Sequence, residues 1–164
     1  MTTQSQPLDP EHAAFIQGGV SIVAAARNAD NETTLSRAVG CRVSTDRRHV
    51  TILLSATQSA ALLADVRANG IIAVVFSQPR QHRAIQLKGV DAVVVPLADE
   101  DPHLVAAYRR RLGAEVAPLG YRDAFVQAVM SVVPGDVVAV GFTPSAAFLQ
   151  TPGPKAGTRL RSSP

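Results

Sequence analysis

The feature that most constrains the fold is a series of strand-like segments joined by short turns. Residues 20–26, 33–43 and 49–54 are rich in aliphatic and β-branched side chains, which favour strands. The polar turn segments 28–31 and 44–47 separate them. Parallel neighbours would need a crossover of about a dozen residues or more, so connections this short predict antiparallel hairpins.

Three further strands are expected at residues 71–77, 83–96 and 136–148. Four helical segments are placed among the strands. They are a segment opening with Asp9-Pro10, residues 58–69, a segment opening with Asp101-Pro102, and residues 121–133. An aspartate followed by proline is a typical helix N-cap and first helical position. Gly70 is predicted to end the second helix in the left-handed conformation.

Strands joined by tight turns disfavour a doubly wound parallel sheet, in which strands alternate with helices. We therefore expect a mainly β, α+β fold, a six-stranded antiparallel β-barrel with peripheral helices, whose closure removes exposed strand edges. The 164 residues suit one domain with one core, expected over residues 1–150. Residues 151–164 are rich in Pro, Gly and Ser and are expected to form an irregular tail.

Composition narrows the class of protein. Apolar residues make up 46% of the chain and charged residues 18%, so there is ample side-chain volume for a core. No apolar run approaches the roughly 20 residues that cross a bilayer, and the first ten residues show no secretory signal. The single cysteine, Cys41, excludes an internal disulfide and fits a reducing compartment. A soluble cytoplasmic protein is expected.

The basic charge balance raises the question of nucleic-acid binding. The net charge is only +3, and the chain has five Phe, two Tyr and no Trp. Base stacking needs an aromatic platform, which this composition supplies poorly. We expect neither nucleic-acid nor membrane binding.

Several kinds of catalytic and metal site find little support. The four histidines do not stand at a metal-ligand spacing, so no metal is expected. Cys41 lies between Val39 and Val43 in a predicted strand, which favours a buried, inert thiol. The chain contains no P-loop, no Gly-x-Gly-x-x-Gly and no Gly-x-Ser-x-Gly. The acidic run at residues 99–101 is expected to cap a helix.

A helix start with nearby hydroxyl groups is a candidate anion site. Ser55, Thr57 and Ser59 surround the predicted beginning of the helix at residue 58. A helix N-terminus offers unpaired amides and partial positive charge, which suit a phosphate. Arg37 on a neighbouring strand is a candidate for the balancing cation. The alternative is that the hydroxyls only cap the helix and Arg37 is an exposed strand residue.

A second candidate is the basic strand at residues 83–89. In an alternating strand, Arg83 points to the opposite side from Gln86 and Lys88. One face then presents an amide beside a cation, a pairing suited to a flat, anionic, hydrogen-bonding ligand. His82 adjoins this strand at its entrance.

The order of these segments resembles the pyridoxamine 5'-phosphate oxidase-like, FMN-binding split-barrel family. The resemblance covers residues 15–148. It rests on the N-terminal helix, the strand with Ser36-Arg37, the strand running into the helix at 57–70, and the strand pair 71–76 and 83–89. It implies a split β-barrel, a homodimer and FMN bound in clefts between the two barrels.

Carried over to this sequence, the resemblance makes Arg37 an arginine lining the flavin site and Ser59 a phosphate-binding hydroxyl. Gln86 and Lys88 would lie beside the cofactor. The authentic oxidases have an Arg-Lys pair after the helix-start serine, where this chain has Ala60-Ala61. They also have an Arg-x-His substrate motif near the C-terminus, which this chain lacks. Conversion of pyridoxamine phosphate is therefore not expected.

Three functional hypotheses follow. The first is an FMN-dependent oxidoreductase with an unidentified small substrate, whose cofactor site includes Arg37, Ser55, Thr57, Ser59, Arg83, Gln86 and Lys88. The second is a non-catalytic binding module on the same barrel that has lost FMN. It would hold another flat ligand such as haem, with His82 as the candidate axial ligand, or serve as a dimeric scaffold. The third, a basic nucleic-acid-binding protein, has the least support.

Overall fold

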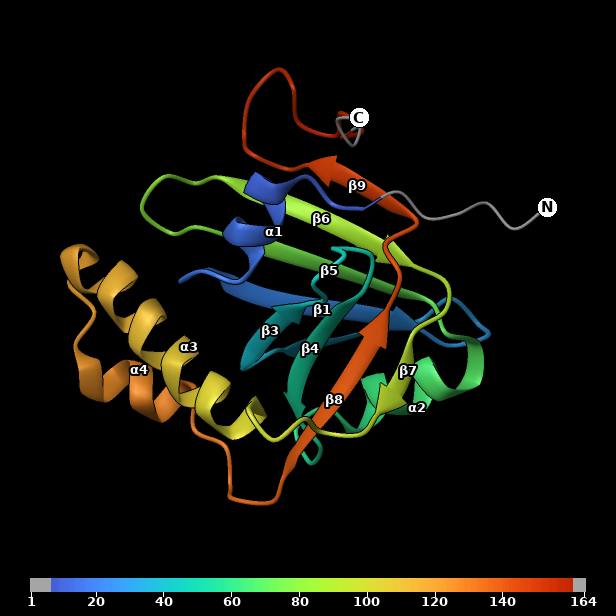
Figure 1. Cartoon of the computed structure of the whole chain (residues 1–164), viewed down its shortest axis with the longest axis horizontal. Coiled ribbons are helices and arrows are strands. Elements are labelled where there is room, and N and C mark those ends of the chain that lie inside the picture. The colour runs from blue at the N-terminus through green and yellow to red at the C-terminus, as the bar shows by residue number, and fades with distance from the viewer. Residues whose placement is uncertain (1–6, 161–164) are drawn as a thin grey trace.

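The computed structural model describes residues 7–160, and these residues form nine strands, four α-helices and one 3-10 turn (Figure 1). The outermost residues of the expected domain and tail, 1–6 and 161–164, lie outside the described part. The strands are β1 Ser21–Arg27, β2 Thr33–Arg37, β3 Gly40–Val43, β4 Val50–Ser55, β5 Ile72–Ser77, β6 Ala84–Gly89, β7 Val93–Val95, β8 Val137–Phe142 and β9 Ala146–Leu149. The helices are α1 Pro10–Ile16, α2 Ala60–Asn69, α3 Asp101–Val116 and α4 Asp123–Val129, with the 3-10 turn η1 at Ala117–Leu119.

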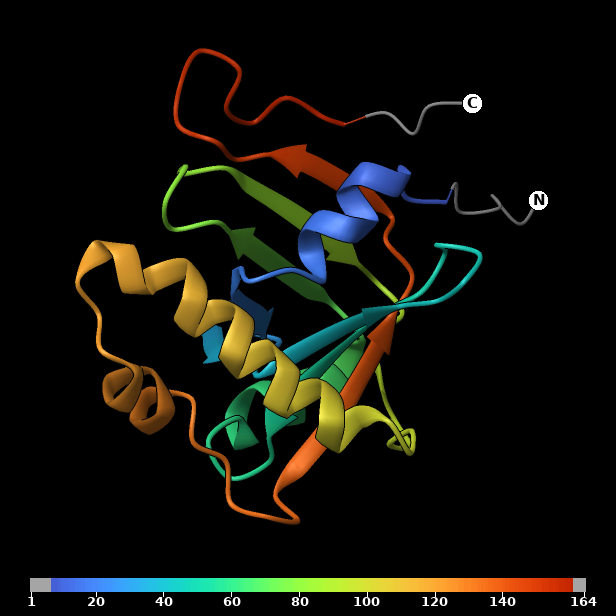
Figure 2. The ribbon, with the colours of Figure 1, turned by 60° about the vertical axis from the view of Figure 1, so that its left-hand side comes forward.

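The strands form two antiparallel sheets, so the fold is mixed α+β. One sheet has five strands in the order β2-β1-β5-β6-β9, and the other has four in the order β3-β4-β8-β7. The inner faces of both sheets contribute to one core, which includes Ile22, Phe76 and Leu87 from the first and Ile52 and Val140 from the second. Helices α3 and α4 lie side by side on one flank, while α2 lies on the opposite flank (Figures 1 and 2).

The expectation of six strands in one barrel is wrong, because three of the expected strands each break into two. Residues 33–43 supply β2 and β3, which belong to different sheets. The backbone amide of Ala38 donates to Ile22 of the first sheet, and that of Val39 donates to Leu53 of the second. The chain therefore changes sheets between two neighbouring residues without a turn signal in the sequence.

The other two breaks have the same origin. Residues 83–96 divide into β6 and β7, and residues 136–148 divide into β8 and β9. In both cases the second half joins the opposite sheet. The corner between them is held together by the amide of Thr143, which donates to Asp91 at 2.8 Å. Neither segment carries a Gly-Pro or Asn-Gly type of turn signal at its corner, so the sequence predicts one continuous strand in each case.

The helix starts are partly as expected. Asp9 caps α1 by accepting from the amide of Glu11 at 2.8 Å, and Gly70 ends α2 with φ 68°. Asp101, however, is not an N-cap. It is the first residue of α3, after the N-cap Glu100, and its fully buried carboxylate pairs with Arg42 of β3 at 2.9 Å.

Close packing fixes the position of α3 against the first sheet. The Tyr108 hydroxyl donates to the carbonyl of Val20 at 2.7 Å, and Arg111 donates to the carbonyl of Gln17 at 3.0 Å. A side chain at Gly19 would bring its Cβ within 2.6 Å of the Arg111 carbonyl oxygen. Only glycine permits this approach, which brings α3 over the beginning of β1.

The end of the described chain pairs with β9. Residues 158–160 fold back along this strand, where the amide of Leu149 donates to the carbonyl of Thr158 and that of Leu160 donates to the carbonyl of Ala147.

Across residues 7–160, no helix has both the length and the apolar character needed to span a membrane.

Candidate functional site

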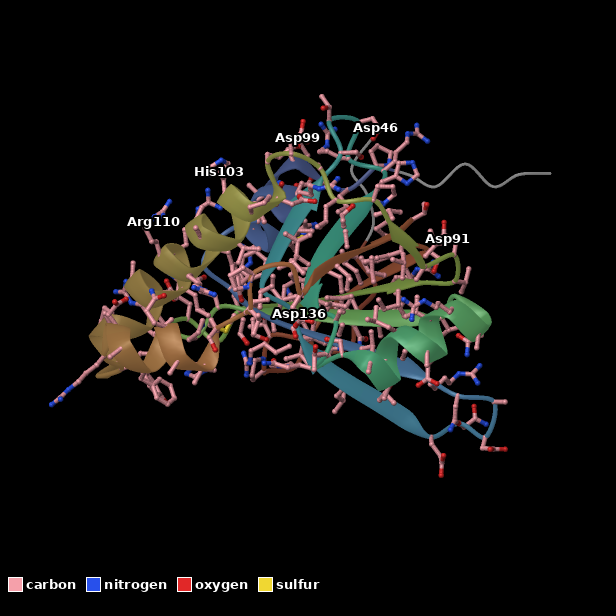
Figure 3. The ribbon with its side chains drawn as sticks, turned by 90° about the horizontal axis from the view of Figure 1, so that it is seen from below. Asp46, Asp91, Asp99, His103, Arg110 and Asp136 are labelled. Atoms are coloured by element: carbon pink, nitrogen blue, oxygen red, sulfur yellow. The ribbon has the colours of Figure 1, made fainter. Side chains whose placement is uncertain are left out.

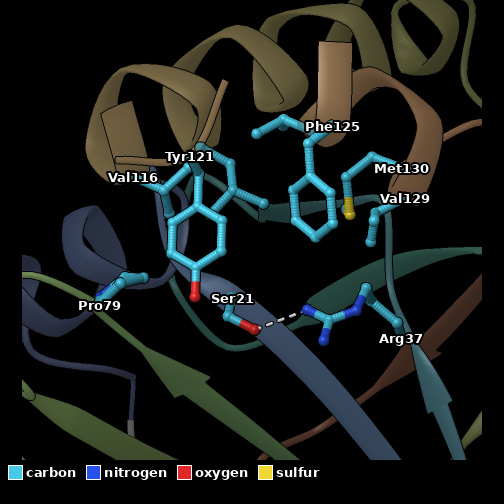
Figure 4. Close-up of a pocket in the computed structure, with 10 residues that line it drawn as sticks. Ser21, Arg37, Pro79, Val116, Tyr121, Phe125, Val129 and Met130 are labelled. Carbon is cyan, nitrogen blue, oxygen red and sulfur yellow. Dashed lines mark hydrogen bonds between the residues drawn. The ribbon is translucent and has the colours of Figure 1, made fainter. Parts of the chain in front are cut away.

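A cavity of about 310 Å³ lies where α3 and α4 overhang the beginning of β1 (Figure 4). Its size is at the low end of the range for ligand pockets, roughly 300–1,000 Å³. The side chains that line it are Ser21, Arg37, Pro79, Leu112, Val116, Tyr121, Phe125, Val126, Val129 and Met130. The walls are mostly apolar, and the charge comes from one side chain, Arg37.

The aromatic wall comes from the segment that includes α4. The rings of Tyr121 and Phe125 lie 5.5 Å apart with an interplanar angle of 30°. Both residues remain about half exposed, at 50% and 52%, whereas Val126 and Met130, which line the same cavity, are buried. Half-exposed rings beside a cavity provide a surface on which a flat ligand can stack.

The floor of the cavity carries a cation without a carboxylate partner. Arg37, at the end of β2, is exposed, and its Nη1 donates to the Ser21 hydroxyl at 2.8 Å (Figure 4). No ion pair involves Arg37 in the described part of the chain. A guanidinium held by a neutral hydroxyl keeps donors free for a carboxylate or phosphate.

The hydroxyls at the start of α2 already have an anionic partner. The Ser55 hydroxyl donates to one carboxylate oxygen of Asp136, a residue labelled in Figure 3. The Thr57 amide and hydroxyl donate to the other oxygen at 3.0 and 2.7 Å. These hydrogen bonds favour the charged carboxylate and hold the pKa of Asp136 below its usual range, the Ser55 hydroxyl having the largest effect. Asp136 thus occupies the region expected to hold a phosphate.

Ser59 and Arg37 lie on opposite sides of β2. Ser59 is 2% exposed, and its hydroxyl lies 2.5 Å from that of Ser36 on the inner face. Arg37 follows Ser36 in the strand and therefore points to the outer face. Because Arg37 and Ser59 lie on opposite faces of β2, one functional group of a ligand does not contact both of these side chains in the same subunit.

The remaining predicted residues lie on or beside β6. Gln86 and Lys88 are on the outer face, where Gln86 accepts from Gln150 at 3.4 Å and the Lys88 ammonium lies 5.1 Å from the Phe148 ring centre. Arg83 instead pairs with Glu11 of α1 at 2.8 Å and covers the ring of Phe15. Gln86 and Arg37 belong to one cross-strand row, separated by three strand spacings, about 14 Å.

The outer face of the five-stranded sheet is a continuous, mostly apolar surface beside the cavity. Two cross-strand rows make it up. The first contains Arg37, Val23, Val75, Gln86 and Phe148, and the second contains Leu35, Ala25, Ala73, Lys88 and Ala146. Most of these residues are only partly buried, and Leu35 is 67% exposed. We call this surface the outer sheet face.

The other candidates show no ligand geometry. His82 is exposed in the turn before β6 with φ 54°. Cys41 is buried, and burial raises the pKa of its thiol far above its usual value, as in an inert cysteine. Within residues 7–160, no three His, Cys, Asp or Glu side chains gather closely enough to hold a metal ion.

Two features of the candidate site are not among the sequence predictions. The aromatic wall has a sequence signal, since Tyr121, Phe125 and Val129 recur every four residues, a spacing that places them on one face of a helix. Asp136 had no such signal, because its partners Ser55 and Thr57 are about eighty positions away in the chain.

No family model matches the chain, and no curated protein matches its sequence. Solved structures do match. HupZ of group A Streptococcus has a TM-score of 0.54 at 15% identity, covering 92% of this chain and 99% of that chain. An F420 reductase has a TM-score of 0.52 at 12% identity, covering 82% and 93%. A candidate pyridoxamine 5'-phosphate oxidase from Lactobacillus delbrueckii has a TM-score of 0.51 at 14% identity, covering 90% and 97%.

The resemblance expected from the sequence is thereby confirmed as one of fold. The chain has the fold of the pyridoxamine 5'-phosphate oxidase-like, FMN-binding proteins, at sequence identities of 12–15%. The likeness extends over most of both chains in each comparison.

FMN has a flat ring system and a phosphate group, and the described residues suit the ring system better than the phosphate group. The cavity at Arg37 offers two aromatic rings, aliphatic walls and one cation, which suit a flat ring system with an anionic group. The start of α2 does not suit a phosphate, because the Asp136 carboxylate takes the donors there. Ala60 and Ala61 supply no cation.

Proposed function

We propose that this chain is a split-barrel protein that binds a flat aromatic ligand of the flavin class in the cavity at Arg37. The observation that carries the proposal is the exposed guanidinium of Arg37, held only by a neutral hydroxyl, at the floor of an apolar cavity with two aromatic rings. The ring of the ligand would pack against Tyr121 and Phe125, and Arg37 would hold its anionic group or a ring carbonyl.

A bound flavin would supply hydride or electron transfer to a small substrate, which is the oxidoreductase form of this proposal. The described residues would bind and orient the ring and exclude water from one side of it. The fold shared with an F420 reductase supports this class of chemistry. No residue of the cavity other than Arg37 and Tyr121 carries a titratable side chain, so the proposal assigns no acid or base.

Replacing Arg37 with Ala is expected to weaken flavin binding by about tenfold or more, because a charge-assisted hydrogen bond contributes roughly 1.5–3 kcal/mol. Quenching of flavin fluorescence during titration with the protein measures the affinity. Arg110→Ala, at another exposed arginine, is the matched control and should bind as the wild type does. Equal affinity in R37A and wild type would remove Arg37 from the site.

We also propose that a second copy of the chain covers the outer sheet face, giving a homodimer. This face is apolar over most of its two rows and joins the cavity at Arg37. Exposed apolar patches of this kind mark interaction surfaces. A partner on this face would close the open side of the cavity.

Replacing Val75 with Lys is expected to convert the dimer into a monomer, because it places a charge at the centre of the outer sheet face. Sedimentation equilibrium measures the mass in solution. Val90→Lys is the control, since Val90 is 67% exposed in the β6–β7 connection and belongs to neither cross-strand row. A wild-type monomer would contradict the dimer, and a V75K variant that remains dimeric would contradict an interface on the outer sheet face.

A second function has one specific observation in its favour. The Asp136 carboxylate at the start of α2 and the absence of cations at Ala60 and Ala61 favour a binding module that has lost FMN. Such a module would hold another flat ligand in the same cavity or act as a dimeric scaffold. Absorption spectra with haem and with flavin distinguish the two functions, and His82→Ala tests the axial ligand.

A further inference from the structure

We infer that Asp136 is the residue that sets the ligand class of this protein, because its carboxylate replaces a ligand phosphate at the start of α2. The chain would therefore bind a flat ligand without contacting a phosphate group at the start of α2. Riboflavin has no phosphate group and FMN has one, so these two flavins serve as the probes. The choice of flavins as probes rests on the proposed function. The occupation of the α2 start by the Asp136 carboxylate does not depend on that function.

The carboxylate of Asp136 takes the donors that a phosphate would need. One oxygen accepts from the Ser55 hydroxyl, and the other accepts from both the amide and the hydroxyl of Thr57. The Ser55 hydroxyl also accepts from the amide of Gln58 at 3.2 Å, so its orientation is fixed. An incoming phosphate would have to displace the carboxylate from all three donors.

The backbone holds Asp136 in this position. Its amide donates to the carbonyl of Val133 at 2.9 Å, and its carbonyl accepts from the amide of Ala56 at 2.7 Å. The residue stands directly before β8, which pairs with β4 up to the Ser55–Val137 pair. The carboxylate is therefore positioned by the sheet and does not need to reach across a flexible loop.

Charge strengthens the discrimination. Hydrogen bonds from Ser55 and Thr57 favour the ionised carboxylate, and within residues 7–160 no hydrogen bond or ion pair joins it to a Lys or Arg. A phosphate dianion entering the same region would meet an uncompensated negative charge at short range. Arg37 does not offset it, because it lies on the opposite face of β2 from Ser59.

The alternative is that Asp136 only fastens the β4–α2 turn to β8. Both roles predict some loss of stability when the carboxylate is removed, so stability alone does not separate them. They differ in ligand preference and in anion binding, which a purely structural carboxylate would leave unchanged.

The experiment compares wild type with Asp136→Ser, which removes the charge, and with Asp136→Asn, which removes the charge but keeps an acceptor for the Thr57 amide. Asp46→Ser is the matched control. Asp46 also accepts from a serine hydroxyl, that of Ser44, and from a backbone amide, that of Arg48. Its carboxyl pKa is also lowered, with the Ser44 hydroxyl as the largest cause. Thermal melts select the variants that fold.

The first measurement is the ratio of FMN to riboflavin affinity. We expect D136S or D136N to raise this ratio by about tenfold relative to wild type, the effect of a charge-assisted hydrogen bond gained by the phosphate. D46S should leave the ratio unchanged. An unchanged ratio in folded Asp136 variants that bind flavin would overturn the inference.

The second measurement uses inorganic phosphate and does not require flavin binding. Phosphate is expected to shift the Thr57 amide resonance in D136S, with saturation, but not in wild type. A saturating shift in wild type, or none in either folded Asp136 variant, would overturn the inference. If no protein binds flavin but the Thr57 shift appears in D136S alone, the proposed function fails and the inference about Asp136 stands.

Discussion

Replacing Arg42 with Met is expected to lower the free energy of unfolding by about 3 kcal/mol, the lower end of the range for breaking a buried ion pair. The variant leaves the Asp101 carboxylate fully buried without its cation. The lower end applies because the Arg42 side chain is itself 30% exposed. Water therefore screens part of the interaction. Urea denaturation followed by circular dichroism measures the loss.

A double variant separates the ion pair from side-chain packing. Asp101→Asn keeps an oxygen that can accept from the Ala98 amide, as the carboxylate does at 2.8 Å. In R42M/D101N no charge is left buried, so we expect it to be more stable than R42M alone. An R42M protein within about 1 kcal/mol of wild type would show that water or another group compensates Asp101. The pair also matters for the site, because it fixes the start of α3, whose far end lines the cavity.

Replacing Phe76 with Ala is expected to lower the free energy of unfolding by about 4 kcal/mol, as is typical when a buried aromatic ring is removed. Phe76 has no exposed surface and pairs with Ile22 of β1 and Ile85 of β6. Its ring lies on the inner face of the sheet, in the core shared by both sheets. The surrounding strands limit how far the core can collapse into the resulting space.

Phe76→Leu is the matched control for this variant. It preserves an apolar side chain and most of the volume, so we expect a cost of about 1 kcal/mol. Urea denaturation midpoints of the two variants give the comparison. If F76A and F76L were equally stable, the ring would not be a major part of the core. The outer sheet face and the cavity do not include Phe76, and flavin binding by folded F76L should therefore match wild type.

Much of the fold could be predicted from local sequence signals. The Asp9 cap, the Gly70 helix end and the hairpin between β1 and β2 are determined within a few residues. The sheet changes at Ala38 and after Gly89 are not local. They depend on which distant strand offers the next hydrogen bond, as when Val39 donates to Leu53. No local signal distinguishes the two sides of such a corner, so the sequence predicts six strands where the described residues form nine.

The same distinction between local and long-range determinants applies to the residues of the candidate site. Arg37 could be singled out because a strand cation near a helix start is visible in the sequence, and it does line the cavity. Its separation from Ser59 depends on the alternation of β2. The Asp-Pro pair predicts that Asp101 caps a helix, but in the structure its carboxylate is buried against Arg42 inside the first turn of α3. Asp136 depends wholly on the pairing of β4 with β8.

The most direct test of the central claim is an absorption spectrum of the purified protein after incubation with excess FMN, and separately with riboflavin, followed by removal of unbound ligand. We expect a retained flavin band in wild type with at least one of the two flavins, and a weaker band in R37A. No retained band with either flavin would contradict the proposal that the cavity at Arg37 holds a flavin-type ligand.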